Sequence, residues 1–123
     1  MSDSQLTPHF KQSEFACHCG CGANNINLGL VTKLEVLRNK LNRPITIVSG
    51  VRCKKYNDSL GGSVTDSAHI DGFAVDIAVG SGSDRFEIVS ELQKLGVTRF
   101  GVAKTFVHAD IDASKPQNVI WTY

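Results

Sequence analysis

Two stretches of the sequence carry residues that commonly bind metal ions. His69 and Asp76 lie in one stretch with Gly72 between them, and His108 lies in the other. A catalytic zinc ion usually takes three protein ligands and keeps a fourth position for water. Two His and one Asp would leave the ion a net charge of about +1, so that it lowers the pKa of its water towards about 7. We therefore predict that His69, Asp76 and His108 hold one catalytic zinc ion.

Residue types alone leave a plainer interpretation open for each of these positions. Four His in 123 residues is no enrichment. A single Asp such as Asp76 is more often a buried structural residue that caps a turn.

Hydrolysis also needs a group that accepts a proton from the water and returns it to the leaving amine. In a strand over residues 105–111, alternate side chains share a face, which places His108 and Asp110 side by side, about 7 Å apart. We therefore expect Asp110 to act as the catalytic base, with Asp71 and Asp112 as alternatives.

The elements that position these residues follow from the hydrophobic pattern. Alternation from Gly72 to Val79 predicts a strand whose Asp76 face otherwise carries small residues. A leucine stripe predicts a helix over 28–42 with Asn27 as its N-cap. The β-branched run 45–48 predicts a strand that delivers Arg52 just beyond its end.

The remaining segments complete an α+β domain with a central, mostly antiparallel sheet. We expect a helix that starts at Ser83 and packs through a face including Phe86, strands over 97–102 and 105–111, and an edge strand around Trp121. Residues 54–68 are expected to form a loop. A length of 123 residues predicts one domain, with residues 1–14 as an extended arm anchored by its Phe residues.

Four cysteines stand apart from the predicted zinc ligands. Cys17, Cys19 and Cys21 alternate in one glycine-rich stretch, and Cys53 follows Arg52. They could form two disulfides, remain inert thiols, or bind a structural zinc ion together with His18. A disulfide or a metal would equally tie the N-terminal segment to the loop of Arg52.

The composition excludes several classes of protein. A net charge of +1 without a dense Lys/Arg run argues against nucleic-acid binding. No apolar stretch approaches the roughly 20 residues that cross a bilayer, so we expect no membrane partner. The polar N-terminus lacks a signal-peptide core, which predicts synthesis in the cytoplasm. We expect a monomer, because no extra apolar surface is evident.

The motif Ser67-x-His69-x-x-Gly72-x-Ala74-x-Asp76 resembles the signature of the zinc D-Ala-D-Ala carboxypeptidases and L-alanyl-D-glutamate endopeptidases of bacteria and their phages. These enzymes share the metal-binding fold of the hedgehog signalling domain. Ser49-Gly50-Val51-Arg52, with Tyr56-Asn57 and Gly61-Gly62 after it, resembles their Ser-Gly-Tyr-Arg loop. Phe106-Val107-His108-Ala109-Asp110 resembles the segment with the last zinc ligand, and the cysteine-rich start is similar to a phage-type branch.

The resemblance runs from about Phe15 to Asp112 and implies zinc ligation by His69, Asp76 and His108. It also implies that Arg52 binds a substrate carboxylate or carbonyl, with help from Ser67, because its planar fork matches a carboxylate. Two positions depart from the family pattern. Val51 stands where Tyr is common, and Thr105 stands where many relatives carry an acidic base.

The resemblance predicts zinc-dependent hydrolysis of a peptide bond in bacterial peptidoglycan, with the stem peptide as substrate. Both an endolysin-like and a D-Ala-D-Ala carboxypeptidase-like activity fit this pattern. The alternative is a non-catalytic murein-binding or structural module on the same fold, such as a phage virion component, which the residue Thr105 favours. We expect the protein to reach the cell wall after lysis, by a holin-like route, or as part of a virion.

Overall fold

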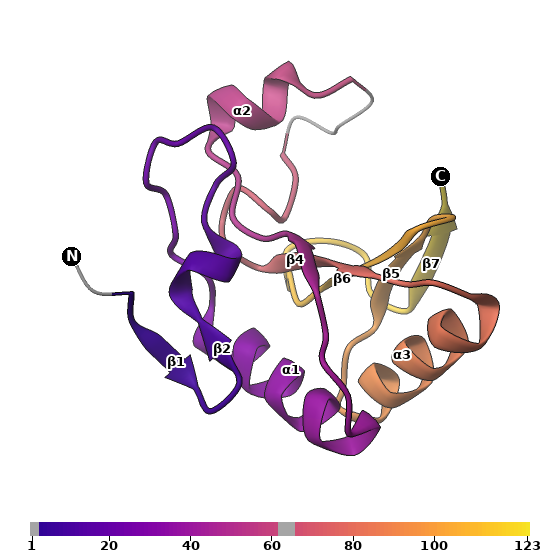
Figure 1. Ribbon diagram of the computed structural model, residues 1–123. Coiled ribbons are helices and arrows are strands. Elements are labelled where there is room, and N and C mark those ends of the chain that lie inside the picture. Colours follow the sequence, from indigo (N-terminus) through magenta and orange to yellow (C-terminus); the bar gives the residue numbers. More distant parts are fainter. Residues whose placement is uncertain (1–2, 62–65) are drawn as a thin grey trace.

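The computed structural model describes residues 3–61 and 66–123, which leaves Gly62 of the predicted loop motif outside the described residues. Its centre is a five-stranded sheet of β3 (Ile47–Ser49), β4 (Ala74–Ala78), β5 (Arg99–Val102), β6 (Phe106–Asp110) and β7 (Val119–Thr122) (Figure 1). The strand order is β3-β4-β6-β5-β7, and every neighbouring pair is antiparallel except the parallel pair β5 and β7. The prediction of an α+β fold with a mostly antiparallel sheet is confirmed.

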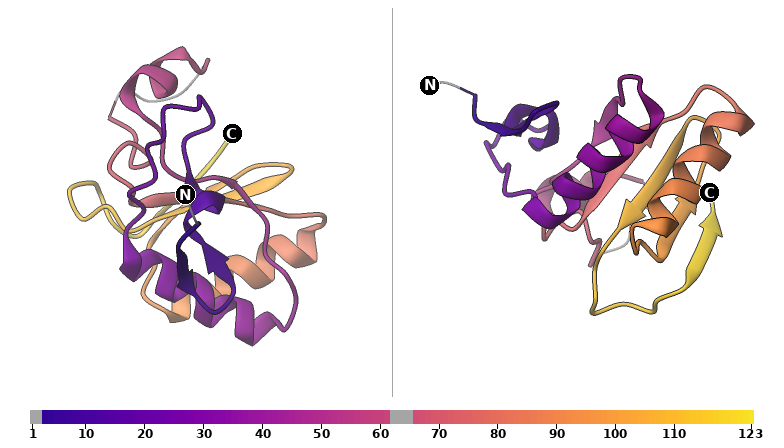
Figure 2. Two further views of the ribbon diagram at one scale, coloured as in Figure 1. Left: turned by 60° about the vertical axis from the view of Figure 1, so that its left-hand side comes forward. Right: turned by 90° about the horizontal axis from the view of Figure 1, so that it is seen from below.

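Two helices, α1 (Leu28–Leu41) and α3 (Gly82–Lys94), cover one face of this sheet (Figure 2). The predicted cap of α1 is confirmed, because the Asn27 side chain accepts a hydrogen bond of 3.2 Å from the backbone N–H of Leu30. The helices and strands share one core, to which the following buried side chains contribute: Leu30, Leu34, Leu37, Val75, Ile77, Ile88, Leu92, Phe100, Val107 and Ala109. None of the helices in the described residues is long and apolar enough to cross a membrane.

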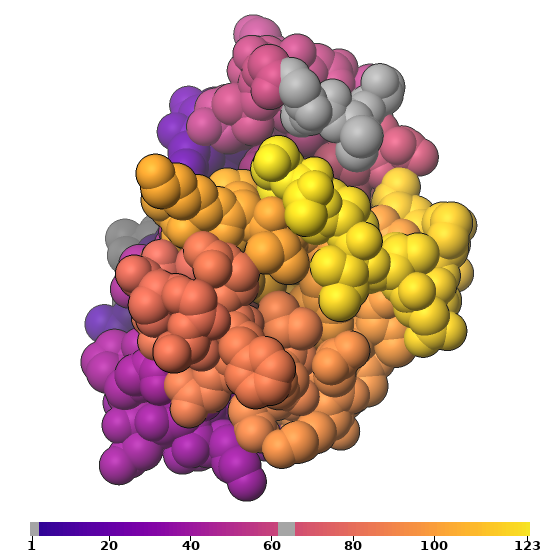
Figure 3. Space-filling view, turned by 90° about the vertical axis from the view of Figure 1, so that its right-hand side faces the viewer, coloured from indigo at the N-terminus to yellow at the C-terminus, as the bar shows by residue number. Residues whose placement is uncertain are grey.

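Helix α3 begins earlier than predicted. Its N-cap is Ser81, not Ser83, and the Ser81 hydroxyl accepts a hydrogen bond of 3.1 Å from the N–H of Asp84. Phe86 was expected on the packed face but is 75% exposed. The buried positions are Ile88 and Leu92, one helical turn apart, and Phe86 precedes Ile88 by two residues, or about 200° around the helix. Figure 3 shows β7 running across the upper part of the molecular face above α3.

The prediction of an extended arm over residues 1–14 is wrong for its described part. β1 (Gln5–Thr7) and β2 (Phe10–Lys11) pair as a small antiparallel hairpin, and the 3-10 helix η1 (Gln12–Phe15) follows. The expected anchors are confirmed, because Phe10 and Phe15 are fully buried with ring centroids 5.9 Å apart. Burial of these two rings holds the segment on the domain.

The expected loop over residues 54–68 contains a short helix, α2 (Lys54–Ser59). Its N-cap is Cys53, whose sulfur accepts a hydrogen bond of 3.3 Å from the N–H of Tyr56. The glycines after Ser59 favour the prediction of a loop. The helix is not marked in the sequence, because its N-cap is a cysteine, which is an unusual N-cap residue. α2 and the cysteine-rich segment lie together, away from α1 and α3 (Figure 1).

We predict that Glu35→Gln weakens the tie between the N-terminal hairpin and α1. The Glu35 carboxylate accepts a hydrogen bond of 2.8 Å from the N–H of His9 and lies 2.5 Å from Nδ1 of the same residue. Burial alone would raise the pKa of Glu35, but the hydrogen bonds from His9 lower it to about 2. Losing a hydrogen-bonded charge of this kind should reduce the free energy of unfolding at pH 7 by about 1–3 kcal/mol.

The sign of the pH dependence follows from the lowered pKa of Glu35. The stabilisation is complete above the ordinary pKa of 4.5 and is lost as the pH falls through about 2. Urea denaturation should therefore show a gap between wild type and Glu35→Gln that narrows below about pH 4.5. Asp58→Asn, which removes an exposed ion pair with Lys54, is the control and should change stability by less than about 1 kcal/mol. A gap that is constant from pH 7 to pH 2 would contradict this assignment.

Candidate metal centre

The register of the sheet places the predicted ligands next to each other. Asp76 of β4 lies opposite His108 of β6, and the same row continues through Ser49 of β3, Gly101 of β5 and Trp121 of β7. Since side chains alternate between the two faces of a strand, the neighbours of Asp76 in β4 point into the helix-covered core. Asp76 and His108 therefore share the opposite face.

His69 reaches this face from the turn that precedes β4. The Ser67 hydroxyl accepts a hydrogen bond of 3.2 Å from the N–H of His69, which fixes the start of the turn. The turn closes at Gly72, whose φ of 75° lies in the left-handed region, and a Cβ there would sit 2.2 Å from the carbonyl oxygen of Asn25. Only glycine meets both constraints. The glycine of the sequence motif thus serves to bring His69 over the sheet.

The three predicted ligands converge as expected. One ligand atom from each of His69, Asp76 and His108 lies within 4.8 Å of the other two. Oδ1 of Asp76 is 3.3 Å from Nε2 of His69 and 3.1 Å from Nδ1 of His108. All three side chains are buried.

The hydrogen bonds of the two imidazoles show which nitrogen is free to bind a metal. Nδ1 of His69 donates to the carbonyl oxygen of Gly50 at 2.6 Å, because a carbonyl can only accept. Nε2 of His69 then carries a lone pair, and this buried atom makes no hydrogen bond within the described residues. Nε2 of His108 lies 2.7 Å from the Asp110 carboxylate, which leaves Nδ1 of His108 facing Asp76.

Three acceptor atoms that face one another in a buried site are unfavourable unless a proton or a metal ion lies between them. Burial disfavours ionisation of Asp76, but the neighbouring imidazoles of His108 and His69 hold its pKa well below the ordinary value. Burial likewise opposes protonation of His108, but hydrogen bonds to Asp110 and Asp76 raise its pKa. The site thus favours positive charge, and its two imidazoles and one carboxylate are ligands that suit zinc.

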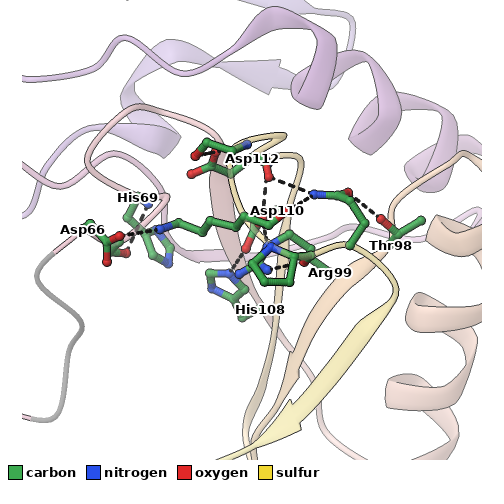
Figure 4. A network of polar contacts seen from close by, with 12 residues as sticks. Asp66, His69, Thr98, Arg99, His108, Asp110 and Asp112 are labelled. Carbon is green, nitrogen blue, oxygen red and sulfur yellow. Dashed lines mark hydrogen bonds and ion pairs between the residues drawn. The ribbon is translucent and has the colours of Figure 1, made fainter.

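Asp110 has the contacts of a residue that orients His108. Its carboxylate accepts hydrogen bonds of 2.7 Å from Nε of Arg99 and 3.2 Å from the N–H of Asp112, in addition to the contact with His108 (Figure 4). Burial alone would raise the pKa of Asp110, but the contacts with His108, Arg99 and the N–H of Asp112 together hold it below the ordinary value. These contacts give no support to the expectation that Asp110 acts as a catalytic base, because its oxygens are already engaged.

The alternative bases, unlike Asp110, do not line the site. Asp71 is exposed, and the carboxylate of Asp112 accepts hydrogen bonds from Ser114. Neither they nor Thr105 line the cavity above the ligands. Within the described residues, the carboxylates at the cavity are those of Asp66, Asp76 and Asp110.

Arg52 and Ser67, which the resemblance implies in substrate binding, both line the cavity. Nη2 of Arg52 donates to Oδ2 of Asp76 at 3.2 Å, and its Nε donates to the hydroxyl of Ser49 at 3.2 Å. These two contacts use two of the five N–H donors of the guanidinium. Arg52 thus steadies the ligand Asp76 and keeps donor capacity for a substrate.

A cavity of about 910 Å³ opens over the ligands and includes residues that the sequence did not indicate. Trp121 packs over Gly101, where a Cβ would lie only 2.5 Å from the indole nitrogen. Its ring centroid is 5.3 Å from that of His108 and 5.1 Å from the guanidinium carbon of Arg99. Asp66 and Lys115 form an ion pair of 3.1 Å at the same cavity. Trp121 pairs with Gly101, which pairs with the ligand His108, so the place of Trp121 near the site follows only from the register of the strands.

The cysteines form a second cluster. The sulfur atoms of Cys17, Cys19, Cys21 and Cys53 lie within 4.8 Å of one another, and all four are free thiols. His18 is exposed, and its ring contacts Tyr56 at a centroid distance of 6.4 Å. The structure therefore brings together the four cysteines and leaves His18 outside their cluster.

Asp110→Asn should separate a role in positioning from a role in proton transfer. If Asp110 orients His108, the substitution weakens zinc binding about 10–100-fold. Competition with a chelating dye measures this affinity, with circular dichroism to verify folding, and Asp71→Asn serves as an exposed control that should change nothing. Unchanged zinc affinity combined with lost turnover would instead restore the assignment of Asp110 as the base.

The comparisons with known proteins agree with this geometry. Residues 8–110 match the family described as Peptidase M15, a range that contains His69, Asp76, His108 and Asp110. No curated protein matches the chain. M15 peptidases are zinc-dependent, and the two imidazoles and the carboxylate of this site could hold such an ion. The match covers most of the chain and confirms the resemblance seen in the sequence: the protein belongs to the Peptidase M15 family of metallopeptidases.

Proposed function

We propose that this protein is a zinc-dependent peptidase that hydrolyses a peptide bond in bacterial peptidoglycan. The observation that carries the proposal is the convergence of three buried acceptor atoms, from His69, Asp76 and His108, beneath an open cavity. Membership of the Peptidase M15 family supports a peptide of the peptidoglycan type as the substrate.

The residues of the chain provide an ordered site for such chemistry. A bound zinc ion supplies a Lewis acid, which polarises a carbonyl group and lowers the pKa of water. The Gly50 carbonyl and the Asp110 carboxylate fix the two His rings so that their free nitrogens point at Asp76. Arg99 holds Asp110 in turn. This ordering means that little rearrangement is needed when the metal binds.

Arg52 is the residue that we assign to substrate recognition. Its side chain is 16% exposed, lines the cavity and is held by contacts to Asp76 and Ser49. A guanidinium fixed in this way can donate its remaining N–H groups to a carboxylate or carbonyl of a stem peptide. The side chains of Phe106, Trp121 and Tyr123 form an apolar wall of the same cavity.

A non-catalytic binding function is the alternative to hydrolysis. Asp66 is 86% exposed and its pKa is lowered, chiefly by the hydrogen bond from Lys115, which makes it a weak base. Thr105 carries no carboxylate, and the oxygens of Asp110 are engaged. These observations favour a zinc-containing murein-binding module, such as a virion component, as the alternative. In either role we propose that the protein acts at the bacterial cell wall.

His108→Ala should remove both zinc and turnover. Loss of one of three ligands removes the Lewis acid, which is worth several kcal/mol, so release of peptides from purified peptidoglycan should fall at least about 10³-fold. Metal analysis of the same samples reports zinc per chain. His18→Ala is the matched control, because His18 is exposed and lies outside both clusters. Zinc-loaded wild type that binds peptidoglycan without cleaving it would establish the alternative function.

Arg52→Lys tests recognition separately from metal binding. Lysine keeps the charge but loses the planar fork, and a hydrogen bond to a charged group is worth about 1.5–3 kcal/mol. We expect kcat/KM on a carboxylate-bearing stem peptide to fall about 10–100-fold while zinc content is retained. The same kcat/KM for both proteins would remove Arg52 from the substrate site.

A further inference from the structure

The geometry of the cysteine cluster matches a metal site. Sγ of Cys19 lies 3.5 Å from Sγ of Cys17 and 3.6 Å from Sγ of Cys53, and all four sulfurs lie within 4.8 Å of one another. Tetrahedral zinc with Zn–S bonds of about 2.3 Å places its sulfurs about 3.8 Å apart. Cys19 thus has two sulfur neighbours at the edge length of such a tetrahedron, an arrangement that no single disulfide pair explains.

The backbone around the cluster favours thiolates. The N–H of Cys53 donates to the sulfur of Cys17 at 3.4 Å, and the N–H of Ala23 donates to the sulfur of Cys21 at 3.5 Å. The sulfur of Cys53 in turn accepts from the N–H of Tyr56 at the start of α2. Hydrogen bonds from N–H groups stabilise negative charge on sulfur, which is the form that binds a metal.

Two glycines allow the cysteine-rich stretch to curl around one centre. Gly20 and Gly22 have φ values of 84° and 87°, in the left-handed region that other residues rarely adopt. In an extended strand, alternate cysteines would lie about 7 Å apart along the chain. The curled backbone instead gathers Cys17, Cys19 and Cys21 on the side of Cys53.

We propose that Cys17, Cys19, Cys21 and Cys53 bind a second, structural zinc ion. This ion fixes the loop that serves the first site. Cys53 directly follows Arg52, whose N–H donates to the carbonyl of His69 at 3.0 Å. The N–H of Val51 donates to the carbonyl of Phe15 at 2.8 Å on the other side of the loop.

The structural zinc site therefore positions Arg52 between the N-terminal segment and the turn of His69. The close approach of the two segments is visible at Gly50, where a Cβ would lie 2.7 Å from Cα of Phe15. Binding of the metal by the cysteines does not depend on the proposed peptidase activity. Only its effect on Arg52 rests on that function.

Cobalt substitution of the full chain tests the proposal. Co²⁺ bound by thiolates gives an intense charge-transfer band, whereas Co²⁺ bound by His and Asp does not. We expect the reduced wild type to bind about two metal ions per chain and to show this band. The double variant Cys19→Ser, Cys21→Ser should lose the band and about one ion, and His69→Ala should lose about one ion and keep the band. His18→Ala is the control and should match the wild type.

Alkylation of the wild type gives a readout that needs no variant to fold. Zinc should protect all four thiols from iodoacetamide, and removal of the zinc by a chelator should expose them. Mass spectrometry counts the alkylated thiols in each sample. Equal alkylation with and without zinc, or a reduced wild type that lacks the thiolate band, would overturn the proposal. A wild type that shows the thiolate band but does not cleave peptidoglycan would count against the proposed function alone.

Discussion

The antiparallel register of β4 with β6 is the constraint on which the candidate site depends. It pairs Asp76 with His108, and it is fixed by the apolar side chains that alternate with them, Val75, Ile77 and Val107, in the core under α1 and α3. A slip of either strand by one residue would turn the apolar side chains of that strand to the cavity and its ligand into the core. The hydrophobic effect that folds the sheet thus also places the two ligands together.

The segments outside the sheet complete the site through close backbone contacts. His69 comes from a turn that only Gly72 can close, and its ring is held by the carbonyl of Gly50. Gly50 in turn abuts Phe15, so the N-terminal segment supports the turn from outside. The buried acceptors of the site would be costly without a compensating cation. The fold stabilises an arrangement whose electrostatics are satisfied when a positive charge binds.

The sequence predicts the fold best where one periodic signal dominates. Alternation in residues 72–79 and the leucines of residues 28–42 predicted β4 and α1, and residue type predicted the three candidate ligands that the structure brings together. The N-terminal hairpin was missed, because β1 and β2 are too short to show a period. Spacing suggested Asp110 as a base, but its pairing with Arg99 depends on the register of β5 with β6, which the sequence does not display. The gathering of Cys53 with the other cysteines likewise depends on tertiary structure.

The most direct measurement of the central claim is anomalous diffraction at the zinc edge from crystals grown with zinc. We predict a peak bonded to Nε2 of His69, to an oxygen of Asp76 and to Nδ1 of His108, at about 2.0–2.2 Å from each. We also predict that Asp110 remains on Nε2 of His108, as it is in Figure 4. The absence of a peak among these three residues under saturating zinc, or a peak bonded to Nε2 of His108, would contradict zinc binding in the proposed geometry.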